Sequence, residues 1–374
     1  MNAGKQSIGT IFDPIFLQHV APISHPERPD RLAAVVQHLQ DTGLWERLSL
    51  IKPRPATFEE LKAAHEPLYV ERTIDRLSLR RSGYLDMGDT FFSPGTKEAA
   101  LCAAGGCVDL ALAVHAGEYP SGAALVRPPG HHADRDTAMG FCVFNNVAIA
   151  AHALLKQGCR RVAILDFDVH HGNGTQDIFY EDPRVLYVSM HQSPLYPGTG
   201  AAEDTGTLDG LGMTANLPLA PYCDDVDWLI GLERLLLPLI RAFSPEILLV
   251  SAGFDAHHLD TISTQQVTDA GYAAIAQRIV ACADQVCGGK VVMMLEGGYH
   301  LEGLAAGVAS FLRQLESRSD DPVLKPHQEP RHTTLASINS ALTRLLPLWP
   351  DFANLGPADQ LGRHEPRPGD DYFL

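Results

Sequence analysis

Five near-continuous apolar runs, rich in β-branched residues, place the strongest constraint on how this chain can fold. They cover residues 122–126, 161–166, 185–190, 246–251 and 290–295. Because polar residues do not alternate with apolar ones in these runs, they predict strands that are buried on both faces. Helical patterns accompany them, over residues 94–116, 146–156, 225–243 and 264–286. Repeated alternation of strand and helix predicts an α/β fold with a parallel sheet and right-handed crossovers.

Polar motifs follow four of the five predicted strands directly. RPPGHH (127–132) follows the first strand, and DFDVHHGNG (166–174) begins where the second one ends. GFDA (253–256) follows the fourth, and EGGY (296–299) follows the fifth. In open α/β sheets, ligands bind at the carboxyl ends of the strands, so we expect the four motifs to meet at one edge.

Asp168, His170 and Asp255 supply the side chains for a metal site at this edge. Residues two apart on an extended chain point to the same side, so Asp168 and His170 emerge together. One nitrogen and two carboxylates leave a coordination position open for water and substrate, as a catalytic zinc requires. An isolated Asp-x-His pair is more often part of a loop hydrogen-bond network, but the surrounding motifs favour the metal site.

The adjacent His131 and His132 are candidates for acid–base chemistry beside the metal. Because neighbouring side chains diverge, only one imidazole can reach a water at the metal as general base. Asp166 and Asn173 are candidate partners for the two rings, and a carboxylate partner leaves its histidine more basic than an amide does. The alternative is one loop histidine and one core histidine with no shared role.

Tyr299 follows two glycines at the end of the fifth predicted strand. Gly297 and Gly298 permit backbone conformations that are closed to other residues and let the chain approach closely. A phenol held there could donate a hydrogen bond to a carbonyl oxygen that turns into an oxyanion. The alternative is a tyrosine in an ordinary surface loop.

Six motifs follow one another along the chain. In order they are RPPGHH, GFCVFNN (140–146), DFDVHHGNG, PGTG (197–200), SAGFDA (251–256) and LEGGY (295–299). Together they resemble the zinc-dependent histone deacetylase superfamily, in particular the bacterial histone deacetylase-like amidohydrolases close to class II. The resemblance runs over most of the chain. It implies a three-layer arginase/deacetylase-like fold, in which helices flank a central and mainly parallel sheet.

The resemblance implies an enzyme, a zinc-dependent lysine deacetylase or deacylase. It would remove acetyl or related short acyl groups from the ε-amine of lysine in proteins or peptides. One zinc and His132 would activate the attacking water, His131 would be the electrostatic neighbour of His132, and Tyr299 would stabilise the oxyanion. The implied catalytic residues are His132, His131, Tyr299, Asp166 and Asn173, and the implied zinc ligands are Asp168, His170 and Asp255.

The resemblance also implies residues that bind substrate and potassium. The acyl-lysine stem would pass Phe141 and Tyr196 in a tunnel, and Asp89 at its rim would accept hydrogen bonds from substrate amides. Acetate would leave past Arg31 through an inner cavity. The implied substrate-binding residues are Asp89, Gly140, Phe141, Tyr196, Ile262, Gly298 and Arg31. One or two structural potassium ions would use Asp166, Ser189 and Met190, with a weaker match at Phe179, Asp182 and Val185.

Three alternatives stay open beside a lysine deacylase. An arginase-like hydrolase would need further acidic ligands for a second metal, and His171 and Asn173 do not supply them. An acylpolyamine amidohydrolase would favour an acidic gatekeeper where this chain has Ile262, although Asp260 and Glu203 lie nearby. A non-catalytic acyl-lysine binding module would be expected to lack a ligand, the base or the tyrosine, and all of these are present.

Net charge, the length of apolar runs and cysteine spacing limit the kinds of partner and the location expected for this protein. A formal net charge of −16 argues against nucleic-acid binding as the main role. The chain starts without a signal-peptide pattern, and no uncharged apolar run reaches the roughly 18 residues of a membrane span, so we expect no membrane partner. Seven scattered cysteines without CxxC spacing fit reduced thiols in the cytoplasm.

One weak boundary divides the chain unequally. Residues 1–316 are expected to form the deacetylase catalytic domain. Residues 317–374 carry a proline-rich segment, a last amphipathic helix near 335–346 and a tail, all expected to pack on the same domain. The tail could wrap around a neighbouring subunit, so a homo-oligomer is one of the expectations.

Overall fold

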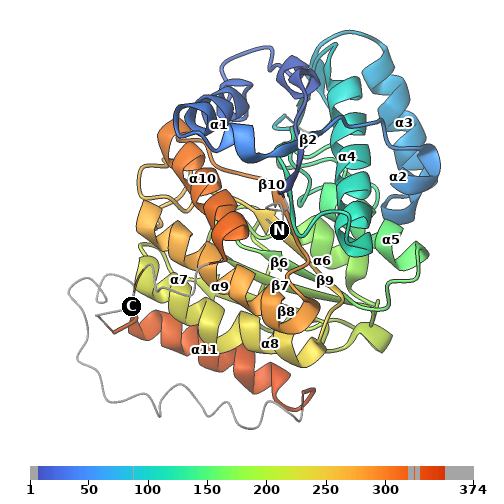
Figure 1. Cartoon of the computed structure of the whole chain (residues 1–374). Coiled ribbons are helices and arrows are strands. Elements are labelled where there is room, and N and C mark those ends of the chain that lie inside the picture. Colours follow the sequence, from blue (N-terminus) through green and yellow to red (C-terminus); the bar gives the residue numbers. More distant parts are fainter. Residues whose placement is uncertain (1–6, 87, 319–323, 325–328, 350–374) are drawn as a thin grey trace.

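An eight-stranded sheet runs through the middle of the molecule (Figure 1). The computed structural model describes residues 7–86, 88–318, 324 and 329–349. The strands of the sheet are β1 (Gly9–Ile11), β2 (Ser49–Ile51), β5 (Gly122–Ala124), β6 (Val162–Asp166), β7 (Val185–Gln192), β8 (Thr214–Leu219), β9 (Ile247–Ala252) and β10 (Val291–Leu295). Their order is β2-β1-β5-β10-β9-β6-β7-β8, and every neighbouring pair runs parallel. A separate hairpin pairs β3 (Gly83–Tyr84) with β4 (Phe91–Phe92).

Helices cover both faces of this sheet. They are α1 (Asp30–Asp41), α2 (Phe58–Ala64), α3 (Pro67–Ser78), α4 (Thr96–Ala116), α5 (Asn146–Lys156), α6 (Asn173–Phe179), α7 (Asp225–Gly231), α8 (Leu237–Phe243), α9 (Asp269–Cys287), α10 (Leu301–Ser317) and α11 (His332–Leu345). On one face α4 and α5 pack together and against the central strands. On the other face α9 packs on β9, α10 on α9, and α1 on α10. The expected α/β fold, with three layers and a mainly parallel sheet, is confirmed.

The five strands predicted from apolar runs are all present, as β5, β6, β7, β9 and β10, with ends that differ by at most two residues. They are buried along their length because helices cover both faces of the sheet. The sequence did not predict β1 and β2, because three residues are too few to show a pattern. It also missed β8, whose apolar run is interrupted by Asn216 and Pro218.

Two predicted helices have different boundaries in the structure. The stretch 225–243 is helical throughout, but the π-helical turn Leu232–Leu236 separates α7 from α8. The stretch 264–286 becomes helical only at Asp269, because Thr268 caps the helix. The Thr268 hydroxyl accepts a hydrogen bond from the Gly271 amide at 3.1 Å, which is the usual geometry of an N-cap.

Helix α4 is, within the described part of the chain, long and apolar enough by length and composition to cross a membrane. Glu98 and Asp109 interrupt its apolar sequence, and Asp109 pairs with Arg54 at 2.8 Å. Most of the helix is buried against α5, β1, β5 and β10. Such burial is typical of the core helix of a globular domain.

Helix α11 packs on the edge of the sheet beside β8 and the π-helical turn. Its buried face includes Leu335, Ile338 and Leu342. Trp349 follows the helix, and its indole N–H donates to the Gly212 carbonyl at 2.9 Å. The division of the chain at residue 316 stays a prediction, and the predicted tail 350–374 lies outside the described residues.

Candidate active site

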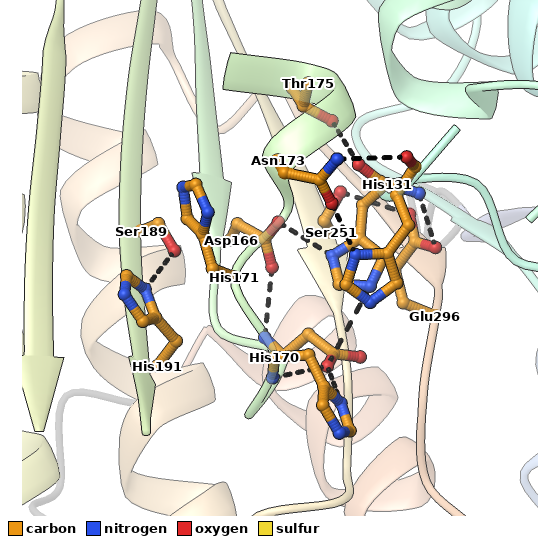
Figure 2. A network of polar contacts seen from close by, with 12 residues as sticks. His131, Asp166, His170, His171, Asn173, Thr175, Ser189, His191, Ser251 and Glu296 are labelled. Atoms are coloured by element: carbon orange, nitrogen blue, oxygen red, sulfur yellow. Dashed lines mark hydrogen bonds and ion pairs between the residues drawn. The ribbon is translucent and has the colours of Figure 1, made fainter. Parts of the chain in front are cut away.

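Four strands that lie side by side deliver the sequence motifs to one rim of the sheet. β5 leads into the segment 125–132, β6 into Asp168 and His170, β9 into Asp255, and β10 into Glu296. These strands are consecutive in the sheet, so their carboxyl ends form one continuous edge. Figure 2 shows polar side chains from this edge converging.

Asp168, His170 and Asp255 form a buried cluster at the rim. One candidate ligand atom from each residue lies within 4.8 Å of the other two. His170 Nδ1 lies 3.1 Å from Asp168 Oδ1 and 3.2 Å from Asp255 Oδ2. The Gly297 amide donates to Asp168 Oδ2 at 2.7 Å. The Val169 amide donates to Asp255 Oδ1 at 3.0 Å, so backbone groups from the motifs themselves orient both carboxylates.

The two carboxylates are close enough to perturb each other. Burial and the neighbouring charge of Asp168 raise the pKa of Asp255 to about 6. Two buried anions in contact repel, and a bound divalent cation would remove that cost. With one nitrogen and two carboxylates, the donor set fits a zinc that keeps a coordination position open.

Glycines make room for these carboxylates. A Cβ atom on Gly253 would lie 2.1 Å from Asp168 Oδ2, and one on Gly297 would lie 2.1 Å from Asp255 Oδ2. Any side chain at either position would therefore displace a candidate ligand. Close approach of the chain was expected at Gly297, whereas the steric role of Gly253 is visible only in the structure.

The two adjacent histidines have different partners. His131 Nδ1 lies 3.1 Å from Asp166 Oδ2, and His132 Nδ1 lies 2.8 Å from Asn173 Oδ1 (Figure 2). The structure thus brings together the two histidines and the two partners that the sequence proposed for them. Both rings are buried, with centroids 4.0 Å apart.

These partners give the two imidazoles opposite protonation tendencies. Burial opposes a charge on His131, but Asp166, Asp168 and Glu296 outweigh it and raise the pKa of His131 to about 10. Burial and the charges of His131 and His170 lower the pKa of His132 well below its ordinary value. His132 is therefore a neutral imidazole beside a cationic one.

Glu296 is a residue of the site that the sequence analysis quoted without assigning it a role. Its Oε2 accepts hydrogen bonds from the Gly130 amide at 2.6 Å and the His131 amide at 3.2 Å. Its Oε1 accepts from the Ser251 hydroxyl at 3.2 Å (Figure 2). Burial raises its pKa to about 7. The Glu296 carboxyl group therefore joins β9, β10 and the loop that carries His131 and His132. In the sequence, its position directly after a predicted buried strand was the signal that could have identified it as a site residue.

A cavity of about 230 Å³ opens above the metal-ligand cluster. Its lining consists of Asp89, His132, Gly140, Phe141, His170, Leu195, Tyr196, Ile262 and Tyr299. Five of the seven residues expected to contact the substrate line this cavity, namely Asp89, Gly140, Phe141, Tyr196 and Ile262. Gly298 lies beside Tyr299, while Arg31 lies behind the cavity wall. The buried His132 and His170 contrast with Asp89 and Tyr196, which are partly exposed.

The aromatic rings and Asp89 shape this cavity. Phe141 and Tyr299 meet edge to face, with centroids 5.9 Å apart. Asp89 Oδ1 accepts the Gly140 amide at 3.2 Å. Burial and a hydrogen bond with Asp86 raise the pKa of Asp89 to about 6.

Arg31 supports both the ring of Tyr299 and the backbone directly before it. The Arg31 guanidinium carbon lies 4.8 Å from the centre of its ring. Arg31 also donates to the carbonyls of Gly298 at 2.6 Å and Glu296 at 2.5 Å, and pairs with Glu27 at 3.1 Å. Burial raises the pKa of the Tyr299 phenol well above its ordinary value, so the hydroxyl keeps its proton.

Asp260 contributes a contact that was not anticipated. Its Oδ2 accepts the amides of Tyr299 and His300, and its Oδ1 accepts the Ile262 amide at 3.2 Å. The side chain is buried and absent from the cavity lining. Asp260 is therefore not a free acid at the rim, as the polyamine alternative had allowed. Glu203 pairs with Arg344 at 3.6 Å and is also absent from the lining.

The residues implied for potassium form two groups. Asp166 and Ser189 are register partners on β6 and β7, with Met190 next to Ser189, whose hydroxyl lies 2.9 Å from His191 Nδ1. The second group, Phe179, Asp182 and Val185, lies between α6 and β7. Asp182 pairs there with Arg184 at 2.6 Å.

Comparison with known proteins identifies the class to which this fold and site belong. Residues 25–315 match the family description "Histone deacetylase domain". The chain is 43% identical over 297 residues to a probable deacetylase of Archaeoglobus fulgidus, covering 79% of this chain and 82% of the relative. It is 38% identical to histone deacetylase 15 of Arabidopsis thaliana, over 94% of this chain and 64% of the relative. This protein belongs to the histone deacetylase family.

Two further comparisons bear on structure and substrate. A crystal structure of the HDA15 HD domain superposes with a TM-score of 0.86 at 37% identity, covering 94% of this chain and 98% of that one. The human relative named polyamine deacetylase HDAC10 is 40% identical over 86% of this chain, which spans 49% of that relative. The family membership and these names support a deacetylase, that is, a hydrolase. The expected bacterial affiliation is not tested by these comparisons and stays a prediction.

Proposed function

We propose that this protein is a zinc-dependent lysine deacylase, which removes acetyl or related short acyl groups from the ε-amine of lysine in proteins or peptides. The cavity of about 230 Å³ carries the proposal, because it joins a candidate metal cluster, a base and a phenol to a partly exposed mouth. Its aromatic walls, Phe141 and Tyr196, suit the aliphatic stem of an acylated lysine. Asp89 at the mouth is a suitable acceptor for backbone amides of a peptide.

Asp168, His170 and Asp255 would hold the zinc. When bound, the ion supplies a Lewis acid that polarises the amide carbonyl and makes water more acidic. The donor set supports one catalytic ion, because both neighbouring candidates for a second set of ligands are committed elsewhere. His171 Nε2 lies 3.0 Å from Gln176 Oε1, and Asn173 Oδ1 contacts His132.

His132 would act as the general base. Its Nδ1 faces the Asn173 carbonyl oxygen, so Nδ1 carries the proton and the Nε2 lone pair is free to take a proton from water. His131, held cationic by Asp166, would stabilise negative charge that develops nearby. The protonated His132 would then deliver its proton to the leaving amine.

Tyr299 would donate a hydrogen bond from its phenol to the oxyanion. Arg31 and Asp260 support the ring and the backbone of this residue, so the donor needs little reorganisation during the reaction. Loss of the hydroxyl should cost roughly two to three orders of magnitude in kcat. The products are a carboxylate and a free amine.

Deacetylation of acetylated polyamines is the second candidate function. The name of the human relative HDAC10 favours it. The cavity lining favours acyl-lysine instead, because Ile262 occupies the rim and Asp260 is bonded to backbone amides. The binding-module alternative is disfavoured because the candidate ligands, base and tyrosine all gather at one cavity.

A matched substrate panel tests the proposal. Acetyl-, propionyl- and lactyl-lysine peptides are compared with N-acetylputrescine, each with wild type and Tyr299→Phe. We expect peptide turnover that collapses in the variant. If only the polyamine is hydrolysed, polyamine deacetylation becomes the favoured function. If no substrate is hydrolysed although zinc is bound, the binding module is favoured.

Other expectations are proposals of the same kind. We propose one structural potassium beside Asp166 and Ser189, and a second, less well supported one near Asp182. A cytoplasmic location, a homo-oligomer and the absence of nucleic-acid and membrane partners stay predictions. Size-exclusion chromatography with light scattering tests the oligomer, and a monomer at micromolar concentration would contradict it.

A further inference from the structure

Three side chains of metal-ligating type meet at the amino ends of β6 and β9, whereas the candidate active site lies at the carboxyl ends of the strands. His115 lies in the last turn of α4, Cys159 lies before β6, and Glu246 directly precedes β9. One nitrogen, one sulfur and one oxygen from these residues lie within 4.8 Å of one another.

The sheet brings these residues together. β6 and β9 are neighbours in register, so the segments that enter them lie side by side. The Glu246 amide donates to the Arg161 carbonyl at 2.9 Å, and the Arg160 amide donates to Glu246 Oε1 at 3.1 Å. Lys290 reaches α4 from the start of β10, where its ammonium donates to the His115 carbonyl at 2.8 Å. These contacts hold Glu246 and the end of α4 in place beside Cys159.

His115 offers a nitrogen that packing leaves unused. Its Nδ1 is buried and makes no hydrogen bond to any described residue. A buried polar atom without a partner is rare in folded proteins and points to a missing ligand, water or ion. Burial and the charge of Lys290 lower the pKa of His115, so the ring is neutral and its lone pair is available.

The other two donors are also available. Cys159 is only 3% exposed, and within the described part of the chain its sulfur makes one long hydrogen bond, 3.6 Å to the Arg161 carbonyl. Arg160 uses only Oε1 of Glu246 in its two hydrogen bonds, which leaves Oε2 for another partner. Although burial opposes its charge, the hydrogen bonds from Arg160 lower the pKa of Glu246, so the carboxylate is ionised.

We propose that His115, Cys159 and Glu246 form a second metal site, for a thiophilic divalent ion such as zinc. A mixed sulfur, nitrogen and oxygen donor set is typical of zinc and unsuited to magnesium or calcium, which take oxygen ligands. Binding forms the bond between Cys159 Sγ and the metal while the thiol proton leaves to solvent. The thiolate and the carboxylate then balance the two charges of the ion. The bound ion ties the end of α4 to the starts of β6 and β9.

Cobalt(II) is the probe that separates this site from the catalytic one. The candidate catalytic ligands include no sulfur, so a thiolate-to-cobalt charge-transfer band can arise only at a cysteine site. We expect the metal-free full-length protein to take up a second equivalent of cobalt and to show this band. Cys159→Ser should lose both the band and the second equivalent while keeping deacylase activity. Cys102→Ser is the matched control, because Cys102 lies on α4 outside the cluster, and it should retain the band.

Two outcomes would overturn the site. One is wild-type protein that binds a single equivalent of cobalt without the band, and the other is a band that survives in Cys159→Ser. If Cys159→Ser folds poorly, His115→Ala and Glu246→Gln replace it, and each should weaken cobalt binding at least tenfold. Zinc should also slow alkylation of Cys159 in native protein, as read by peptide mass spectrometry. Unchanged alkylation would count against the proposal. None of these results depends on which acyl substrate the enzyme uses.

Discussion

The Asp260 carboxylate holds the backbone of Tyr299, because its Oδ2 accepts the Tyr299 amide at 2.6 Å. The same oxygen accepts the His300 amide at 2.9 Å, and the other oxygen accepts the amide of Ile262. One buried carboxyl group therefore joins two parts of the cavity wall. Gly297 and Gly298 come directly before Tyr299, and glycines give a chain little conformational preference of its own. The position of the phenol depends on Asp260.

Asp260→Asn should therefore reduce kcat on the order of tenfold to a hundredfold, since a small displacement of a reacting group is costly. The substitution keeps the size of the side chain but removes its charge and one acceptor. KM should change little, because the cavity lining is intact. Steady-state kinetics, with zinc content measured in parallel, tests this. Asp269→Asn is the control, because it removes an exposed carboxylate nearby. Equal losses in both variants would contradict a specific role for Asp260.

Gly140→Ala should impair the base directly. A Cβ atom there would lie 2.3 Å from the His132 ring, and the residue has a φ of +57°. We expect a fall in kcat on the order of a hundredfold, because the imidazole must move. Gly43→Ala is a matched control, since Gly43 has a φ of +64° but open space around it. A normal kcat in Gly140→Ala would show that His132 tolerates displacement.

Substrate binding should weaken at acid pH through Asp89. Burial and Asp86 raise its pKa to about 6, so the carboxylate is charged above that pH and protonated below it. A protonated Asp89 is a weaker acceptor for peptide amides, and KM should rise as the pH falls through about 6. Peptide KM measured above and below this pH tests the expectation. In Asp89→Asn the rise should disappear, and its persistence there would assign it to another group.

Removal of the catalytic metal should destabilise the fold. Without a cation, Asp168 and Asp255 are adjacent buried carboxylates, and a ligand that binds only the folded state adds about 2.7 kcal/mol at a hundredfold excess over its Kd. Thermal unfolding of Cys159→Ser, with and without chelator, isolates the catalytic site. Zinc should restore the Tm and magnesium should not, because magnesium prefers oxygen ligands. In the same background, Asp255→Asn should make the Tm insensitive to chelator.

The sequence predicted those site residues whose side chains carry the chemistry, and it missed the roles of residues that bind backbone amides. Side-chain chemistry at the ends of buried strands was visible, and Asp166 and Asn173 were proposed from it as partners of the two histidines. Which histidine has which partner is seen only in the structure, where His131 contacts Asp166 and His132 contacts Asn173. The roles of Glu296 and Asp260 were not visible, because both bind backbone amides of segments remote in sequence. Glu296 reaches Gly130 across 166 residues. Any residue type donates such an amide, so the sequence carries no mark of the partner.

The strands of the sheet likewise fall into some that the sequence predicted and some that it missed. Strands β5, β6, β7, β9 and β10 were predicted because burial on both faces leaves an unbroken apolar run. The edge strands β2 and β8, and β1 beside β2, are short or polar, and their pairing depends on neighbours rather than on local pattern. The start of α9 was misplaced because the capping role of Thr268 depends on its backbone conformation.

The order of strands also determines when during synthesis the pocket can first exist. His170 and Asp255 are separated by 85 residues, and Asp168 is fixed by the Gly297 amide, 129 residues away. A ribosome must release the chain as far as Asp255 before a metal can meet all three ligands, and as far as Gly297 before the amide that holds Asp168 is in place. Metal loading is therefore a late event in the synthesis of each molecule, and a nascent chain stopped before β10 would carry all three ligands without the Gly297 amide that holds Asp168.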